Sequence, residues 1–138
     1  MGFTVVGPDH FLGSGHPGSV RDDPPFLGLI ESRDAGNNWR PISLRGEVDF
    51  HVLEAQGAIV YGFGSDFETR AARFLRSEDG GRSWKRLAPP EELTGLAIDP
   101  REPRHIVALG EQRGPRLAGR RLALEATPDP WRVGHLDA

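Results

Sequence analysis

The sequence contains no cysteine, which excludes disulfide bonds and zinc sites built from thiolates. It has no apolar run long enough for a transmembrane helix, and its N-terminus lacks the pattern of a signal peptide. The formal net charge of −3 leaves no basic excess, and most arginines are scattered along the chain. We therefore expect no membrane span and no nucleic-acid partner.

Amphipathic helical periodicity is also missing, whereas glycine and proline are abundant, with 18 and 12 residues respectively. Short alternating apolar segments persist between these turn residues, as in residues 26–30, 58–63 and 105–109. This combination favours a turn-rich β protein over a disordered chain.

One eight-residue signature, S-x-D-x-G-x-x-W, occurs twice, and its two tryptophans lie about 45 residues apart, the length of one propeller blade. The aspartate can accept N–H bonds from the turn that follows, and the glycine tolerates a positive φ. The tryptophan then opens the outgoing strand with a large apolar ring. The signature residues are Ser32, Asp34, Gly36, Trp39, Ser77, Asp79, Gly81 and Trp84.

The signature resembles the Asp box, or BNR repeat, of sialidases, sortilin-type receptors and related β-propellers. The resemblance implies an all-β fold, a partial β-propeller of about two and a half four-stranded blades, with each box turning between the third and fourth strands. It also implies a structural role for Asp34 and Asp79, because the box lies on the rim in those families. Residues 1–110 further resemble a bacterial, exported, glycosyl-hydrolase-like BNR family, which implies an extracellular or cell-envelope location and more sequence before Met1.

The repeat divides residues 1–110 into a blade at about 1–46, a second at about 47–90 and the start of a third at about 91–110. Propellers close with four to eight blades, and an open one exposes unpaired backbone groups and apolar faces. We therefore expect this chain to be a fragment of a larger protein and to self-associate in isolation.

Residues 111–138 form an atypical tail without a third signature or clear strand alternation. Read one nucleotide later, the codons of residues 117–125 can spell Ser-Pro-Asp-Gly-Gly-Ser-Arg-Trp, a complete box. The near-absence of lysine, with Lys85 alone against many arginines, indicates a GC-rich gene. We predict a frame shift before this tail, in which case Trp131 and His135 have no function; the alternative is a solvated tail.

His16, Asp49 and His51 are the candidate ligand-binding residues. Asp49 and His51 lie two apart on a predicted first strand, so we expect their side chains on one face. First strands line the channel of a propeller, and His16 lies in a loop that can reach the same side. Imidazole and carboxylate are common metal ligands, but we prefer the interpretation of a hydrogen-bonded polar pair that faces channel water. We assign no metal and no cofactor.

The sequence predicts no catalytic residue. A sialidase-like enzyme would, by resemblance, need an arginine triad and a Tyr–Glu pair, yet Tyr61 has no recognisable glutamate partner and Arg40 follows the first box. Other glycosidases use two carboxylates, which the spacing does not pair here. The available carboxylates are Glu47, Asp49, Glu54 and Asp66.

These observations predict a binding scaffold whose channel-side loops hold a small ligand, a glycan or a protein partner. The alternative is part of an exo-acting, sialidase-like glycoside hydrolase with catalytic residues mostly outside this segment. A third class among Asp-box propellers is the assembly factor that docks on a partner complex.

Overall fold

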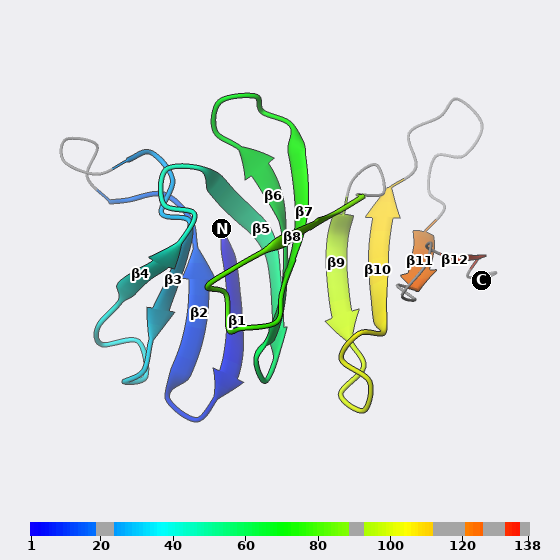
Figure 1. The fold of residues 1–138 in the computed structure, drawn as a ribbon, viewed down its shortest axis with the longest axis horizontal. Helices are drawn as coiled ribbons and strands as arrows, with labels where there is room; N and C mark the ends of the chain where they lie inside the picture. Colours follow the sequence, from blue (N-terminus) through cyan, green and yellow to red (C-terminus); the bar gives the residue numbers. More distant parts are fainter. Residues whose placement is uncertain (19–23, 89–92, 112–120, 126–131, 136–138) are drawn as a thin grey trace. The chain divides into compact units, whose positions relative to one another are not determined.

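The structure, a computed structural model of the chain, describes residues 1–18, 24–88, 93–111, 121–125 and 132–135. These residues form twelve strands arranged as three four-stranded antiparallel sheets, each a meander of consecutive strands (Figure 1). Helices are absent from this described part, so no helix there is long and apolar enough to cross a bilayer. The expectation of an all-β fold is confirmed.

Each sheet keeps the chain order of its strands. The first sheet contains β1 (Gly2–Gly7), β2 (His10–Ser14), β3 (Leu29–Ser32) and β4 (Arg40–Ser43). The second contains β5 (Val48–Gln56), β6 (Ile59–Asp66), β7 (Ala72–Ser77) and β8 (Lys85–Leu87). The third contains β9 (Leu93–Ile98), β10 (Ile106–Glu111), β11 (Arg121–Glu125) and β12 (Arg132–His135).

The third sheet differs from the sequence-based expectation, which placed no strand after residue 110. The backbone of β11 pairs with β10, with Val107 opposite Glu125, and β12 then pairs with β11. A ladder joins backbone groups, so it forms even where side-chain alternation is weak. The rest of the tail, including residues 117–120 of the shifted reading and Trp131, lies outside the described residues.

The chain divides into two compact units, residues 1–88 with the first two sheets and residues 89–138 with the third. In the first unit, β1 and β2 pack against β5, and the two sheets enclose one apolar core. Burying an aliphatic or aromatic side chain in such a core contributes about 1.5–3 kcal/mol. Its buried members are Leu12, Leu29, Val48, Phe50, Leu53, Val60 and Leu75, flanked by Val6, Ile42, Leu44, Ala55 and Trp84.

Candidate functional site

The first signature, box 1 (residues 32–39), folds as a closed turn between β3 and β4. Ser32 Oγ donates to Asp34 Oδ1 at 2.9 Å and accepts the Gly36 N–H at 2.8 Å. Asp34 in turn accepts the backbone N–H of Asn38 at 2.8 Å and its side-chain amide at 2.6 Å. These Asn38 bonds, the side-chain one foremost, hold the pKa of Asp34 below its ordinary value.

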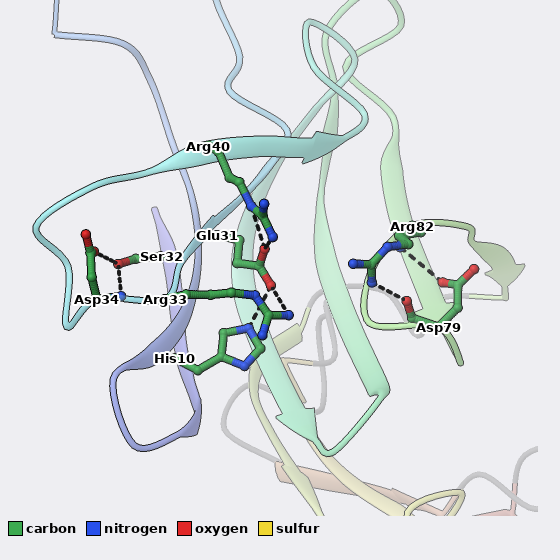
Figure 2. Close-up of polar contacts among 8 residues, drawn as sticks. All are labelled: His10, Glu31, Ser32, Arg33, Asp34, Arg40, Asp79 and Arg82. Atoms are coloured by element: carbon green, nitrogen blue, oxygen red, sulfur yellow. Dashed lines mark hydrogen bonds and ion pairs between the residues drawn. The ribbon is translucent and has the colours of Figure 1, made fainter.

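The second signature, box 2 (residues 77–84), repeats this turn between β7 and β8. Ser77 Oγ donates to Asp79 Oδ1 at 2.7 Å and accepts the Gly81 N–H at 2.8 Å, and Asp79 Oδ1 accepts the Ser83 N–H at 2.8 Å. The Ser83 hydroxyl, which donates to the other carboxylate oxygen, is the main cause of the lowered pKa of Asp79. Figure 2 shows both aspartates directed into their own turns.

The two boxes therefore use their carboxylates to bind their own backbone. An aspartate that accepts several N–H bonds stays ionised and has no proton to donate near neutral pH.

A four-residue charge cluster beside box 1 was not foreseen from the sequence. Glu31 of β3 is buried, and its Oε1 lies 2.8 Å from His10 Nε2 and 2.8 Å from Arg33 Nη2. Its Oε2 accepts two bonds from Arg40, from Nε at 2.9 Å and from Nη2 at 2.6 Å (Figure 2). Glu31 and Arg40 are cross-strand partners. The sequence could have indicated this pair, because residues that flank a hairpin turn face each other.

The electrostatics of this cluster favour an ionised Glu31. Burial alone would raise the pKa of the Glu31 carboxyl, but the bonds from Arg40, Arg33 and His10 together lower it to about 2. The cations thus compensate the cost of burying the carboxylate, as buried charges require.

His16 and Asp49 meet at the opposite ends of the strands from box 1, where the chain passes from β2 to β3. His16 Nε2 lies 3.0 Å from Asp49 Oδ2, and Nδ1 lies 3.1 Å from the Pro25 carbonyl oxygen. The His16 ring also packs edge-on against Phe26, with 5.2 Å between centroids. Asp49 is buried, and its Oδ1 has no hydrogen-bond partner.

His51 does not join these two residues, so the expected three-residue cluster does not form. The β5–β6 register shifts between Phe50 and Val52, which makes His51 the extra residue of a β-bulge. The bulge breaks the two-residue alternation on which a shared face for Asp49 and His51 depended. His51 is exposed, and its Nε2 lies 3.5 Å from Ser65 Oγ.

The remaining carboxylates lie in two different surroundings. Glu47 and Asp66 border a cavity of about 250 Å³, where both form ion pairs with Arg73. Asp66 also accepts N–H bonds from Thr69 and Glu68, and the Thr69 backbone bond is the main cause of its lowered pKa. Burial raises the pKa of Glu54, which lies apart from this cavity on β5. Among the described residues, no group of three acids, histidines or cysteines could hold a metal ion.

No family model and no curated protein sequence matches this chain. Among solved structures, it matches a chain described as "YCF48 bound to D1 peptide", with a TM-score of 0.53 and 15% identity. The match covers 95% of this chain and 37% of the other, so this chain spans little more than a third of that structure's length. The fold is that of a partial β-propeller, and the four-stranded sheets are its blades.

Proposed function

We propose that this chain is part of an Asp-box β-propeller that acts as a rigid binding scaffold for a protein partner, without catalysis of its own. The observation that carries the proposal is the engagement of its acidic groups in structural bonds. Asp34 and Asp79 close turns, Glu31 is bonded to His10, Arg33 and Arg40, and Asp66 pairs with Arg73. A general acid for glycoside hydrolysis instead needs a carboxyl with a raised pKa opposite a second carboxylate.

The matched propeller supports a protein partner over a glycan, since its description names a bound peptide. Binding residues are commonly held on loops positioned by a rigid scaffold. The best candidates here are His16 and Asp49, with His51 two residues beyond Asp49 on the same strand, β5. His16 presents 63% of its side chain to solvent while the buried Asp49 orients its ring.

The alternative, a sialidase-like enzyme, predicts that the protein releases sugar from a sialoside, which can be measured directly. The experiment probes the chain with an immobilised peptide array, a glycan array and a fluorogenic sialoside. We expect binding to peptides, no glycan binding and no hydrolysis. Binding should weaken in His16→Ala and His51→Ala, but not in Arg82→Ala, whose side chain lies in box 2 at the other end of the blades. Sialoside hydrolysis above the rate of a heat-denatured sample would instead support the enzyme.

A further inference from the structure

One face of the first sheet is apolar and exposed to solvent. Phe3 and Val5 of β1 are 55% and 56% exposed, and Trp39 is 40% exposed. Phe11 of β2 lies beside Phe3, with 5.4 Å between ring centroids, and the Trp39 ring lies 6.5 Å from that of Phe3. We call Phe3, Val5, Phe11 and Trp39 the aromatic face. Contiguous exposed apolar side chains of this kind mark an interaction site.

The internal repeat identifies what such a face contacts. In both sheets the box serine pairs with a residue of the second strand, Phe11 in the first sheet and Val60 in the second. Strand pairing then extends the equivalence to the first strands, where Val5 pairs with Phe11 and Ala55 pairs with Val60. The equivalent positions are Phe3 with Leu53, Val5 with Ala55, Phe11 with Val60, and Trp39 with Trp84.

In the second sheet these equivalent positions form the contact with the preceding blade. Leu53 and Val60 are buried in the core cluster, and Ala55 and Trp84 pack against that cluster. The first sheet contributes its opposite face to the same cluster, including the buried Leu12 and Leu29. The aromatic face therefore corresponds to the surface through which the second blade packs against the blade before it.

The hydroxyl of Ser43 makes a polar bridge in the contact between the first two blades. Ser43 of β4 donates to the Gly81 carbonyl oxygen at 2.5 Å and accepts the Trp84 Nε1–H at 2.9 Å. In box 1 the two equivalent groups are bonded directly to each other, Trp39 Nε1 to the Gly36 carbonyl oxygen at 3.1 Å. Box 1 thus presents the same donor and acceptor, without a hydroxyl between them.

We propose that the aromatic face docks a further four-stranded blade of the same repeat, placed before β1 in the ring. Its fourth strand inserts a serine or threonine hydroxyl between Trp39 Nε1 and the Gly36 carbonyl oxygen. Its facing surface carries aliphatic residues at the positions of Leu12, Leu29 and Ile42. This inference follows from the repeat and the fold, and it is independent of the proposed function.

The test attaches such a blade to the full chain. A copy of residues 1–51 is joined directly to Gly2. Gly2 is the position in the first sheet that corresponds to Val52 in the second, so the joint has the same length as the native connection between the two blades. Because the chain has no cysteine, Val5→Cys introduces a unique thiol on the aromatic face. Its reaction with a thiol reagent is compared with and without the added copy. Glu68→Cys, in the exposed β6–β7 turn, is the matched control.

We expect the added copy to slow the reaction of Val5→Cys about tenfold, since the thiol becomes accessible only when the blades separate. The reaction of Glu68→Cys stays unchanged. Ser43→Ala, introduced in the copy alone, removes the bridging hydroxyl. It should make the protected Val5→Cys thiol react about fivefold faster than it does beside the unchanged copy. Leu29→Arg in the copy, which places a charge on its facing surface, should remove the protection.

Three results would overturn the proposal. The first is an unprotected Val5→Cys thiol beside a copy that circular dichroism shows to be folded. The second is a copy that stays unfolded, because docking on a complementary face should fold it. The third is protection by the copy that persists when the copy carries Leu29→Arg, measured at a dilution at which the chain without the copy is a monomer.

Discussion

Glu31 shows how a buried charge contributes to stability at the scale of one residue. Its pKa is lowered from an ordinary 4.5 to about 2 in the folded chain, so the folded state favours the ionised form. The stabilisation is therefore complete above pH 4.5 and is lost as the pH falls towards 2. We expect Glu31→Gln to lower the free energy of unfolding at pH 7 by about 2 kcal/mol and to flatten its dependence on acid pH. Urea unfolding at several pH values measures both effects.

Glu54 is a matched control, because its pKa is shifted in the opposite direction to that of Glu31. Burial raises its pKa, so its contribution is present in acid and is lost as the pH rises through the folded-state value. Glu54→Gln should therefore leave the chain no less stable at pH 7. An equal loss of stability in both variants would contradict the assignment of the Glu31 effect to its ion pairs.

At the scale of the element, box 2 depends on a backbone conformation and on a close approach. Gly81 has φ +92°, and a Cβ at this position would collide with the Leu29 side chain of β3. Gly57 also has a positive φ, +60°, but no atom lies near the corresponding Cβ position. We expect Gly81→Ala to destabilise the chain by about 3 kcal/mol and Gly57→Ala by about 1 kcal/mol. Equal losses in thermal unfolding would indicate that only the φ angle matters.

The hydroxyl of Ser43 connects two elements, β4 and box 2. Ser43→Ala leaves the Trp84 N–H and the Gly81 carbonyl without their partner, which should cost about 1–2 kcal/mol. Ser43→Thr retains the hydroxyl and should cost less. Urea unfolding followed by tryptophan fluorescence compares the two, and equal losses would contradict a role for the hydroxyl.

Elements were more predictable from the sequence than the contacts between them. The boxes predicted where β3 and β7 end, because serine, aspartate and glycine at those spacings favour a tight turn. The His51 bulge was not predictable, since an extra residue in a ladder has no side-chain signature. The Glu31 cluster also required the β3–β4 register, which places Arg40 opposite Glu31.

At the scale of the whole molecule, the proposed preceding blade accounts for the exposure of an apolar face. The two-residue period of β1 places Phe3 and Val5 on one side, and a sequence pattern cannot tell which face lacks a neighbour. The predicted frame shift also belongs to this scale. Sequencing of the gene should reveal a third box in the shifted frame of residues 117–125, and codons that spell no box would refute the shift.

The exposed aromatic face finally predicts the behaviour of the isolated chain. An apolar sheet face without a neighbouring blade should drive self-association, and a charge placed on it should oppose that association because burying an unpaired carboxylate is costly. We expect the chain to form concentration-dependent oligomers and Val5→Glu to shift them towards the monomer. Ala58→Glu adds the same charge at an exposed turn between β5 and β6 and should leave the oligomers unchanged. Light scattering after size exclusion compares the three proteins. If both variants dissociate the oligomers equally, net charge rather than the aromatic face governs association.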